Sequence, residues 1–113
     1  MHEMALSLGL LDVIADASAK NAVSHVKRVI VEIGTLSHVE PEAMAFCFDQ
    51  AAMGTVAEGA VLEIETPKGF AWCFDCEDTV EIGRRGDACP LCGGYGLMVN
   101  GGEELRLKEL EVI

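Results

Sequence analysis

This sequence of 113 residues has few basic side chains and no long apolar run. It holds 8 lysines and arginines against 19 aspartates and glutamates, which gives a formal net charge of −11 at pH 7. Such a chain repels the phosphate backbone of nucleic acids, so we expect no nucleic-acid partner. The sequence also lacks the roughly 18 consecutive apolar residues that a membrane-spanning helix needs. His2 and Glu3 stand where a signal peptide would carry lysine or arginine, and we therefore expect a cytoplasmic protein with reduced cysteines.

Two identically spaced cysteine pairs carry the strongest chemical signal. Each pair has the form Cys-x-x-Cys, and the four residues are Cys73, Cys76, Cys89 and Cys92. Two such turns can close a tetrahedron of thiolates around one Zn²⁺. Because four thiolates leave no open position on the metal, we expect a structural zinc site and no enzymatic activity. Two disulfides, or a redox-active pair as in a thiol oxidoreductase, are the alternatives.

The hydrophobic pattern predicts two helices and three strands in a chain long enough for one small domain that carries a smaller module. We expect helices at 4–20 and 41–54, strands at 26–33, 60–66 and 104–112, and a zinc segment at about 69–96. The first helix should bury a stripe formed by Met4, Leu8, Leu11 and Ala15 and widened by Leu10, Ile14 and Ala17. This order predicts an α+β fold in which two helices pack on a small three-stranded sheet, with an inserted four-cysteine zinc-ribbon module.

Some single residues in these segments also carry expectations. Trp72, Phe74 and Tyr95 flank the cysteine pairs, and we expect them to form the small core of the zinc module, with a partner-docking surface as the alternative. Cys47 lies in the second predicted helix among apolar residues, so we expect it to be a small buried side chain.

The amino terminus offers a second kind of metal site. The α-amine of Met1, the following backbone amide and the His2 imidazole can chelate one metal in fused rings. Deprotonated amide nitrogens with an imidazole favour square-planar Ni²⁺ or Cu²⁺. A histidine near a chain end is more often simply solvated, so residue chemistry alone leaves that alternative open. His25 and His38 fall in predicted loops and are expected at the surface.

Several segments together resemble the HypA/HybF family, the nickel metallochaperones of [NiFe]-hydrogenase maturation. The resemblance covers essentially the whole chain in order. It is carried by the opening Met-His-Glu-Met-Ala-Leu, by Val-Glu-Ile-Gly after the first helix, by Val39-Glu40-Pro41-Glu42, and by the cysteine pairs followed by Gly93-Gly94.

The resemblance implies a carrier of metal rather than an enzyme. It implies a nickel-binding α/β domain at 1–68 and 97–113, with Ni²⁺ held as transient cargo at Met1, His2 and Glu3, and a zinc-binding domain at 69–96. It also implies delivery to the [NiFe]-hydrogenase large-subunit precursor together with a HypB-type GTPase. A zinc-ribbon adaptor without a second metal is the alternative. The last strand could pair within the chain or across a homodimer, because a sheet edge carries unpaired backbone groups.

Overall fold

The computed structural model describes residues 2–113 and confirms the predicted α+β class. Its elements follow the order α1 (Glu3–Lys20), β1 (Val26–Ile33), α2 (Pro41–Ala51), β2 (Val61–Glu65), β3 (Gly69–Cys73), β4 (Asp78–Ile82), β5 (Leu97–Gly101) and β6 (Leu105–Val112). The two predicted helices are present, and β1, β2 and β6 lie where the three strands were expected. Within the described residues, neither helix has the length and apolar character needed to cross a membrane.

The chain divides into two compact units, which we describe separately. The helical unit comprises Met1–Val31, Val39–Ile64 and Leu107–Ile113, and the cysteine unit comprises Glu32–His38 and Glu65–Arg106. The cysteine unit thus takes in more of the chain than the zinc segment at 69–96. Which metal belongs to which unit stays a prediction at this point.

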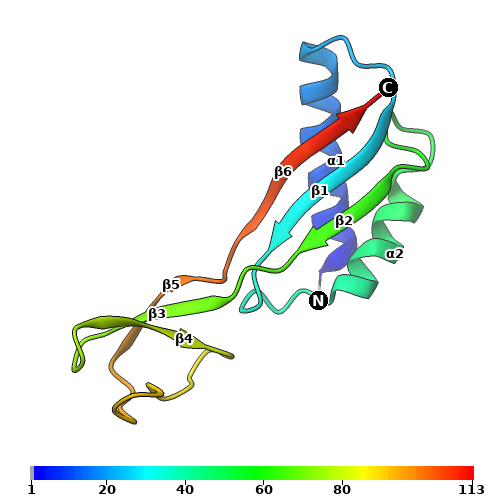
Figure 1. Ribbon diagram of the computed structural model, residues 1–113. Helices are drawn as coiled ribbons and strands as arrows, with labels where there is room; N and C mark the ends of the chain where they lie inside the picture. Colours follow the sequence, from blue (N-terminus) through cyan, green and yellow to red (C-terminus); the bar gives the residue numbers. More distant parts are fainter. Residues whose placement is uncertain (1) are drawn as a thin grey trace. The chain divides into compact units, whose positions relative to one another are not determined.

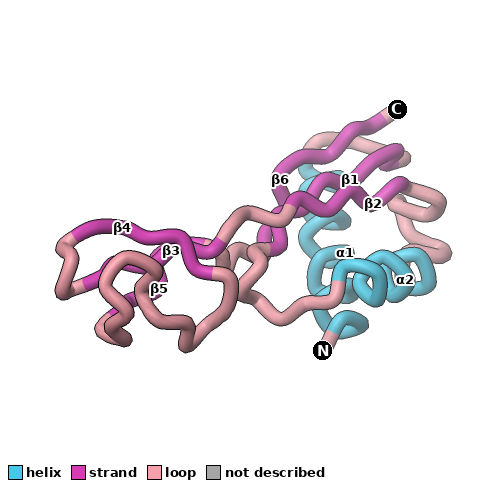
Figure 2. The backbone as a smooth tube through the Cα atoms, turned by 60° about the horizontal axis from the view of Figure 1, so that its bottom comes forward, coloured by secondary structure: helices cyan, strands magenta, loops and turns pink. Residues whose placement is uncertain are grey.

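The sheet formed by β2, β1 and β6, in that order, is covered by both helices on one face (Figures 1 and 2). The arrows of β1 and β2 in Figure 1 point the same way, whereas β6 runs in the opposite direction. Parallel neighbours need a crossover connection, and α2 supplies it between β1 and β2. The β-branched run of β1 makes it the central strand, and Val26, Val29 and Val31 are all buried.

Helix α1 buries only part of the predicted stripe. Leu11 and Ile14 are buried, whereas Met4 and Leu8 are 43% and 52% exposed. The buried face is still spaced by three and four residues, but it includes two serines, since it consists of Ser7, Leu11, Ile14 and Ser18. The small Ser7 side chain allows close approach to α2, where its hydroxyl lies 3.5 Å from the Met44 sulfur.

The cysteine unit contains an antiparallel sheet in the order β4-β3-β5. The sequence pattern did not predict these three strands. Its register pairs Ala71 with Val80 on one side and with Val99 on the other. Because side chains alternate across a strand, Ala71 and Cys73 share the buried face of β3. The core of this unit consists of Leu36, Ala71, Cys73, Val80, Ile82 and Cys89.

The expected aromatic core of the zinc module is wrong. Phe74 and Tyr95 are 59% and 76% exposed, and Trp72 is only half-buried. Alternation along β3 explains Trp72, because it precedes Cys73, which faces inward, and its own side chain therefore faces the opposite side of the sheet.

Three glycines meet where separate segments of the cysteine unit cross. A Cβ on Gly34 would lie 2.0 Å from the Gly102 carbonyl oxygen, and one on Gly102 would lie 2.5 Å from the Gly69 Cα. Gly102 also has φ +93, a value that side chains rarely tolerate. The backbones are tied at this point by the Leu36 N–H, which donates to the Gly102 carbonyl at 2.8 Å. Any larger side chain would separate these segments.

Candidate metal centres

The structure brings the four paired cysteines together. Their sulfur atoms all lie within 4.8 Å of one another, and this is the one group of three or more potential metal ligands among the described residues. The Cys73 and Cys92 sulfurs are 3.7 Å apart, and those of Cys76 and Cys89 are 3.9 Å apart. With Zn–S bonds of about 2.3 Å, the edge of a tetrahedral site is about 3.8 Å. The sulfur spacing therefore fits one four-coordinate Zn²⁺.

The same geometry does not fit disulfides. All five cysteines are free, and sulfurs 3.7 Å apart are much farther than the roughly 2.05 Å of an S–S bond. Cys47 is the fifth cysteine, and it lies outside the sulfur cluster on α2. Its side chain is half-buried, so it is less buried than predicted.

Two turns of the same kind present the sulfurs. In the first, the Glu77 N–H donates to the Cys73 carbonyl at 2.8 Å, and in the second the Gly93 N–H donates to the Cys89 carbonyl at 2.8 Å. Glu77 and Gly93 follow the second cysteine of each pair, and both have left-handed φ angles, 52 and 76. Glycine adopts this conformation freely and signals the second turn in the sequence. Nothing in the residue type of Glu77 signals the first.

Backbone amides point at the sulfurs and shift their acidity. The N–H of Leu91 lies 3.4 Å from the Cys89 sulfur. The Cys92 N–H, together with that of Leu91, lowers the pKa of the Cys89 thiol to about 7 against the opposing effect of burial. The neighbouring Cys92 thiol, followed by burial, raises the pKa of Cys76 to about 12. Without a cation the cluster therefore disfavours four simultaneous thiolates, and a divalent metal removes that conflict.

The predicted nickel ligands lie at the start of α1, where Met1 is outside the described residues. His2 is exposed and precedes the helix with a left-handed φ of 60, and its carbonyl accepts the Leu6 N–H at 3.0 Å. The Glu3 carboxylate accepts the backbone N–H of Glu40 at 3.1 Å, so it ties the start of α1 to the residue before α2.

The remaining histidines lie outside the sulfur cluster. His25 and His38 are exposed, as predicted, and neither belongs to the sulfur cluster. The sequence did not predict the hydrogen bond from the Glu40 N–H to Glu3. The donor is a backbone group, so the residue type does not reveal it.

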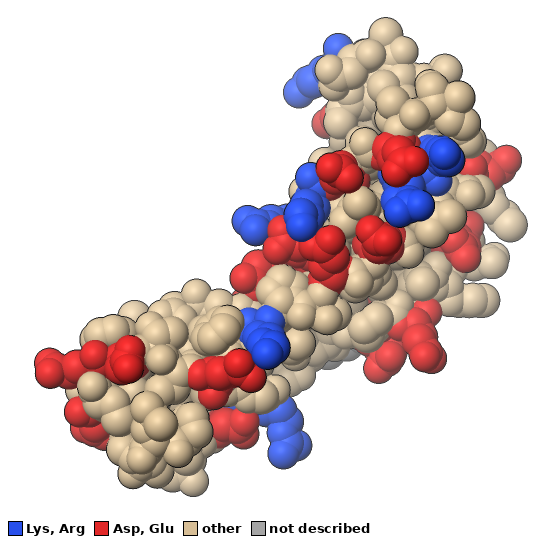
Figure 3. Space-filling model, viewed as in Figure 1, with Lys and Arg blue, Asp and Glu red and all other residues tan. Residues whose placement is uncertain are grey.

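The face seen in Figure 3 carries both acidic and basic side chains and has no large patch of positive charge. Arg28 lies 3.6 Å from the carboxylates of both Glu63 and Glu111, and Lys27 is 3.6 Å from Glu111. The basic residues of β1 are thus paired with acidic ones. Acidic side chains outnumber basic ones, so many of them have no basic partner and the protein keeps a net negative charge.

Comparisons with known proteins point in one direction. A family model described as "Hydrogenase/urease nickel incorporation, metallochaperone, hypA" matches residues 1–112. The chain is 51% identical to hydrogenase maturation factor HypA 1 of Bradyrhizobium diazoefficiens and 54% identical to hydrogenase maturation factor HypA of Albidiferax ferrireducens, in each case over 99% of both chains. Its fold is similar to the solution structure of the Ni metallochaperone HypA from Helicobacter pylori, with a TM-score of 0.72 and 25% identity over 100% of this chain and 98% of that one.

Proposed function

The chain belongs to the HypA family of metallochaperones for hydrogenase and urease nickel incorporation, and we propose that it binds Ni²⁺ at its amino terminus and delivers it to a [NiFe]-hydrogenase large-subunit precursor. The family's members are maturation factors, which agrees with a carrier rather than a catalyst. The observation that carries the proposal is the exposed His2 at the second position of a chain that matches this family from its first residue.

The proposed nickel ligands are the Met1 amine, the His2 imidazole and the backbone nitrogens at His2 and Glu3. Deprotonated amides and imidazole suit Ni²⁺, whereas a tetrahedron of thiolates suits Zn²⁺. The hydrogen bond from the Glu40 N–H to Glu3 supports a fixed starting point for this segment at α1. Because His2 is exposed, cargo can arrive and leave without opening the core.

The proposed resident metal is Zn²⁺ at Cys73, Cys76, Cys89 and Cys92. The sulfur distances support it, and a bound ion would cross-link the two turns of a unit that has only a small apolar core. This closed cage would stay filled while nickel is exchanged elsewhere. The domain division that we propose places nickel with the helical unit and zinc with the cysteine unit.

Release would follow when a partner offers competing ligands. Amide nitrogens and imidazole must lose protons to bind metal, so lower pH also favours release. We propose a HypB-type GTPase and the hydrogenase precursor as partners, in the cytoplasm, with a homodimer as a further assembly. The net charge of −11 favours recruitment of Ni²⁺, although salt screens this attraction beyond about 8 Å.

A titration of zinc-loaded protein with Ni²⁺ tests the proposal, provided that the amino terminus carries no tag. We expect His2→Ala to weaken nickel binding by at least about tenfold. Removing a residue that only hydrogen-bonds to a metal ligand already lowers metal affinity by about tenfold or more, and removing the ligand itself should lower it at least as much. His25→Ala is the matched control, because His25 is exposed and distant in sequence. Equal nickel binding by the His2→Ala variant and the unaltered protein, with zinc unchanged, would instead support a zinc-ribbon adaptor without a second metal.

A further inference from the structure

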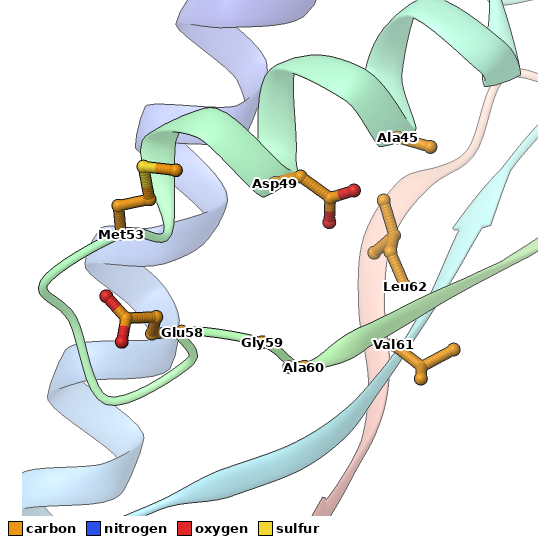
Figure 4. A pocket seen from close by; sticks show the side chains of 8 residues that line it. All are labelled: Ala45, Asp49, Met53, Glu58, Gly59, Ala60, Val61 and Leu62. Atoms are coloured by element: carbon orange, nitrogen blue, oxygen red, sulfur yellow. The ribbon is translucent and has the colours of Figure 1, made fainter.

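A pocket in the helical unit lies between α2 and the start of β2, and none of its lining residues is a proposed metal ligand (Figure 4). Its volume is about 720 Å³, within the range of about 300–1,000 Å³ typical of ligand sites. The pocket is lined by three residues from α2 and its C-terminal end and by five consecutive residues leading into β2, namely Ala45, Asp49, Met53, Glu58, Gly59, Ala60, Val61 and Leu62.

The pocket opens beside a sheet edge. β2 is a terminal strand in the order β2-β1-β6, so its outer side has no neighbouring strand in the sheet. Leu62 points toward α2 and Asp49, whereas Val61 points to the other side of the strand (Figure 4). Met53 is 63% exposed, which leaves apolar surface uncovered at the mouth of the pocket.

The charge of the pocket has one sign. Asp49 and Glu58 are its two charged lining residues, and one Glu58 oxygen accepts the Gly54 N–H at 2.7 Å. Neither carboxylate forms an ion pair within residues 2–113. The two basic residues on the adjacent strand β1 are already paired, Arg28 with Glu63 and Lys27 with Glu111. A cationic side chain from outside would meet an uncompensated carboxylate at Asp49.

We propose that the edge of β2 and this pocket together bind an extended, basic segment of a partner protein. The segment pairs its backbone with the free side of β2, and one of its lysine or arginine side chains enters the pocket. The aliphatic part of that side chain packs on Met53 and Leu62, and its charge lies at Asp49. Side chains of an extended segment alternate, so one basic residue enters the pocket while its neighbours face away.

The same charges disfavour a second copy of this chain as the occupant. β2 itself carries Glu63 and Glu65, so two β2 edges brought together would place like charges side by side. The net charge of −11 also repels an identical chain and attracts a basic one, which raises the association rate. The proposal goes beyond metal carriage, because it involves neither the amino terminus nor the cysteines.

Two short peptides of equal length, one alternating valine and lysine and the other alternating valine and glutamate, serve as probes. They are titrated into full-length, zinc-loaded, nickel-free protein, with binding followed by fluorescence anisotropy and by backbone amide NMR. We expect the lysine peptide to bind and to shift the amides of residues 59–65, and the glutamate peptide not to bind. Because nickel is absent, the result is independent of the proposed cargo site.

Two variants sharpen the test. Asp49→Asn should lower the affinity for the lysine peptide by about threefold, as expected for a partly exposed ion pair. Asp16→Asn on α1 makes the same charge change outside the pocket and should leave this affinity unchanged. Ala45→Arg should abolish binding, because its own guanidinium can reach Asp49 one helical turn away and fill the pocket. Unaltered thermal unfolding shows that each variant is folded.

The proposal is overturned if neither peptide binds, or if the shifted amides lie on another surface. It is equally overturned if Asp49→Asn and Asp16→Asn weaken binding to the same extent, since that result reports the total charge of the protein and not a pocket.

Discussion

The helical unit and the cysteine unit differ in the kinds of side chain that form their cores. In the helical unit, large side chains such as Phe48, Ile14 and Met44 are fully buried between two helices and a sheet. In the cysteine unit, the buried cluster has no aromatic residue and no methionine, and it includes Cys73 and Cys89. The first unit holds together by apolar burial, whereas two of the six core residues of the second are also candidate metal ligands. Removing a metal there would remove part of the core.

The two proposed metal sites differ in the same way. In the sulfur cluster two of the four candidate ligands, Cys73 and Cys89, are buried, so a bound ion would be held partly inside the unit. The proposed nickel site begins at an exposed residue, His2, before the first helical turn. A metal that is part of a core is retained as long as the unit is folded, and a metal at a chain end can leave without unfolding. That contrast is what a carrier with a structural ion requires.

Removing the proposed zinc should have the largest effect. Cys73→Ser, or chelation of the metal, is expected to unfold the cysteine unit, because structural zinc contributes about 10–16 kcal/mol in small domains. The helical circular dichroism signal from α1 and α2 should persist. Zinc content and amide NMR of residues 65–106 measure the outcome, with Cys47→Ser as the control outside the cluster. One zinc per chain and a fully folded Cys73→Ser variant would show that this residue is not a ligand.

A core truncation in the helical unit should have a smaller effect that leaves zinc in place. Phe48→Ala is expected to lower the free energy of unfolding of this unit by about 3–5 kcal/mol, since Phe48 is fully buried. Phe46→Ala on the same helix is the matched control, because Phe46 is 66% exposed. Urea unfolding followed by circular dichroism compares the two. If both substitutions cost the same, α2 does not pack through the face seen here.

Sequence patterns located most elements because each has a strong local cause. The β-branched run of β1 and the Pro41 start of α2 depend on few distant contacts, and both lie where predicted. The spacing of the cysteine pairs likewise predicted the sulfur cluster, since the geometry of one tetrahedral ion limits how the pairs can be arranged.

The remaining errors come from contacts that the sequence does not encode locally. The buried face of α1 includes Ser7 and Ser18, because close packing against other elements favours small side chains over a more hydrophobic stripe. The left-handed turn at Glu77 and the hydrogen bond from the Glu40 N–H to Glu3 depend on backbone positions fixed by the whole fold. Tertiary context decides such positions, and periodicity does not report them.

The exposed aromatic residues give the smallest predicted effect and the sharpest test of how the cysteine unit is built. Tyr95 is 76% exposed beside the second cysteine turn, so Tyr95→Ser should change the free energy of unfolding by less than about 0.5 kcal/mol and leave zinc bound.

Val80→Ala is the comparison. It removes two methyl groups from a side chain that is 5% exposed and should lower the free energy of unfolding by about 1.5 kcal/mol or more. Trp72, the one tryptophan of the chain, lies on β3 and reports the unfolding of this unit by its fluorescence. A cost for Tyr95→Ser as large as that for Val80→Ala would mean that aromatic packing holds the unit together. The expected order places the interior on the sulfur side of the sheet and leaves the aromatic rings outside it.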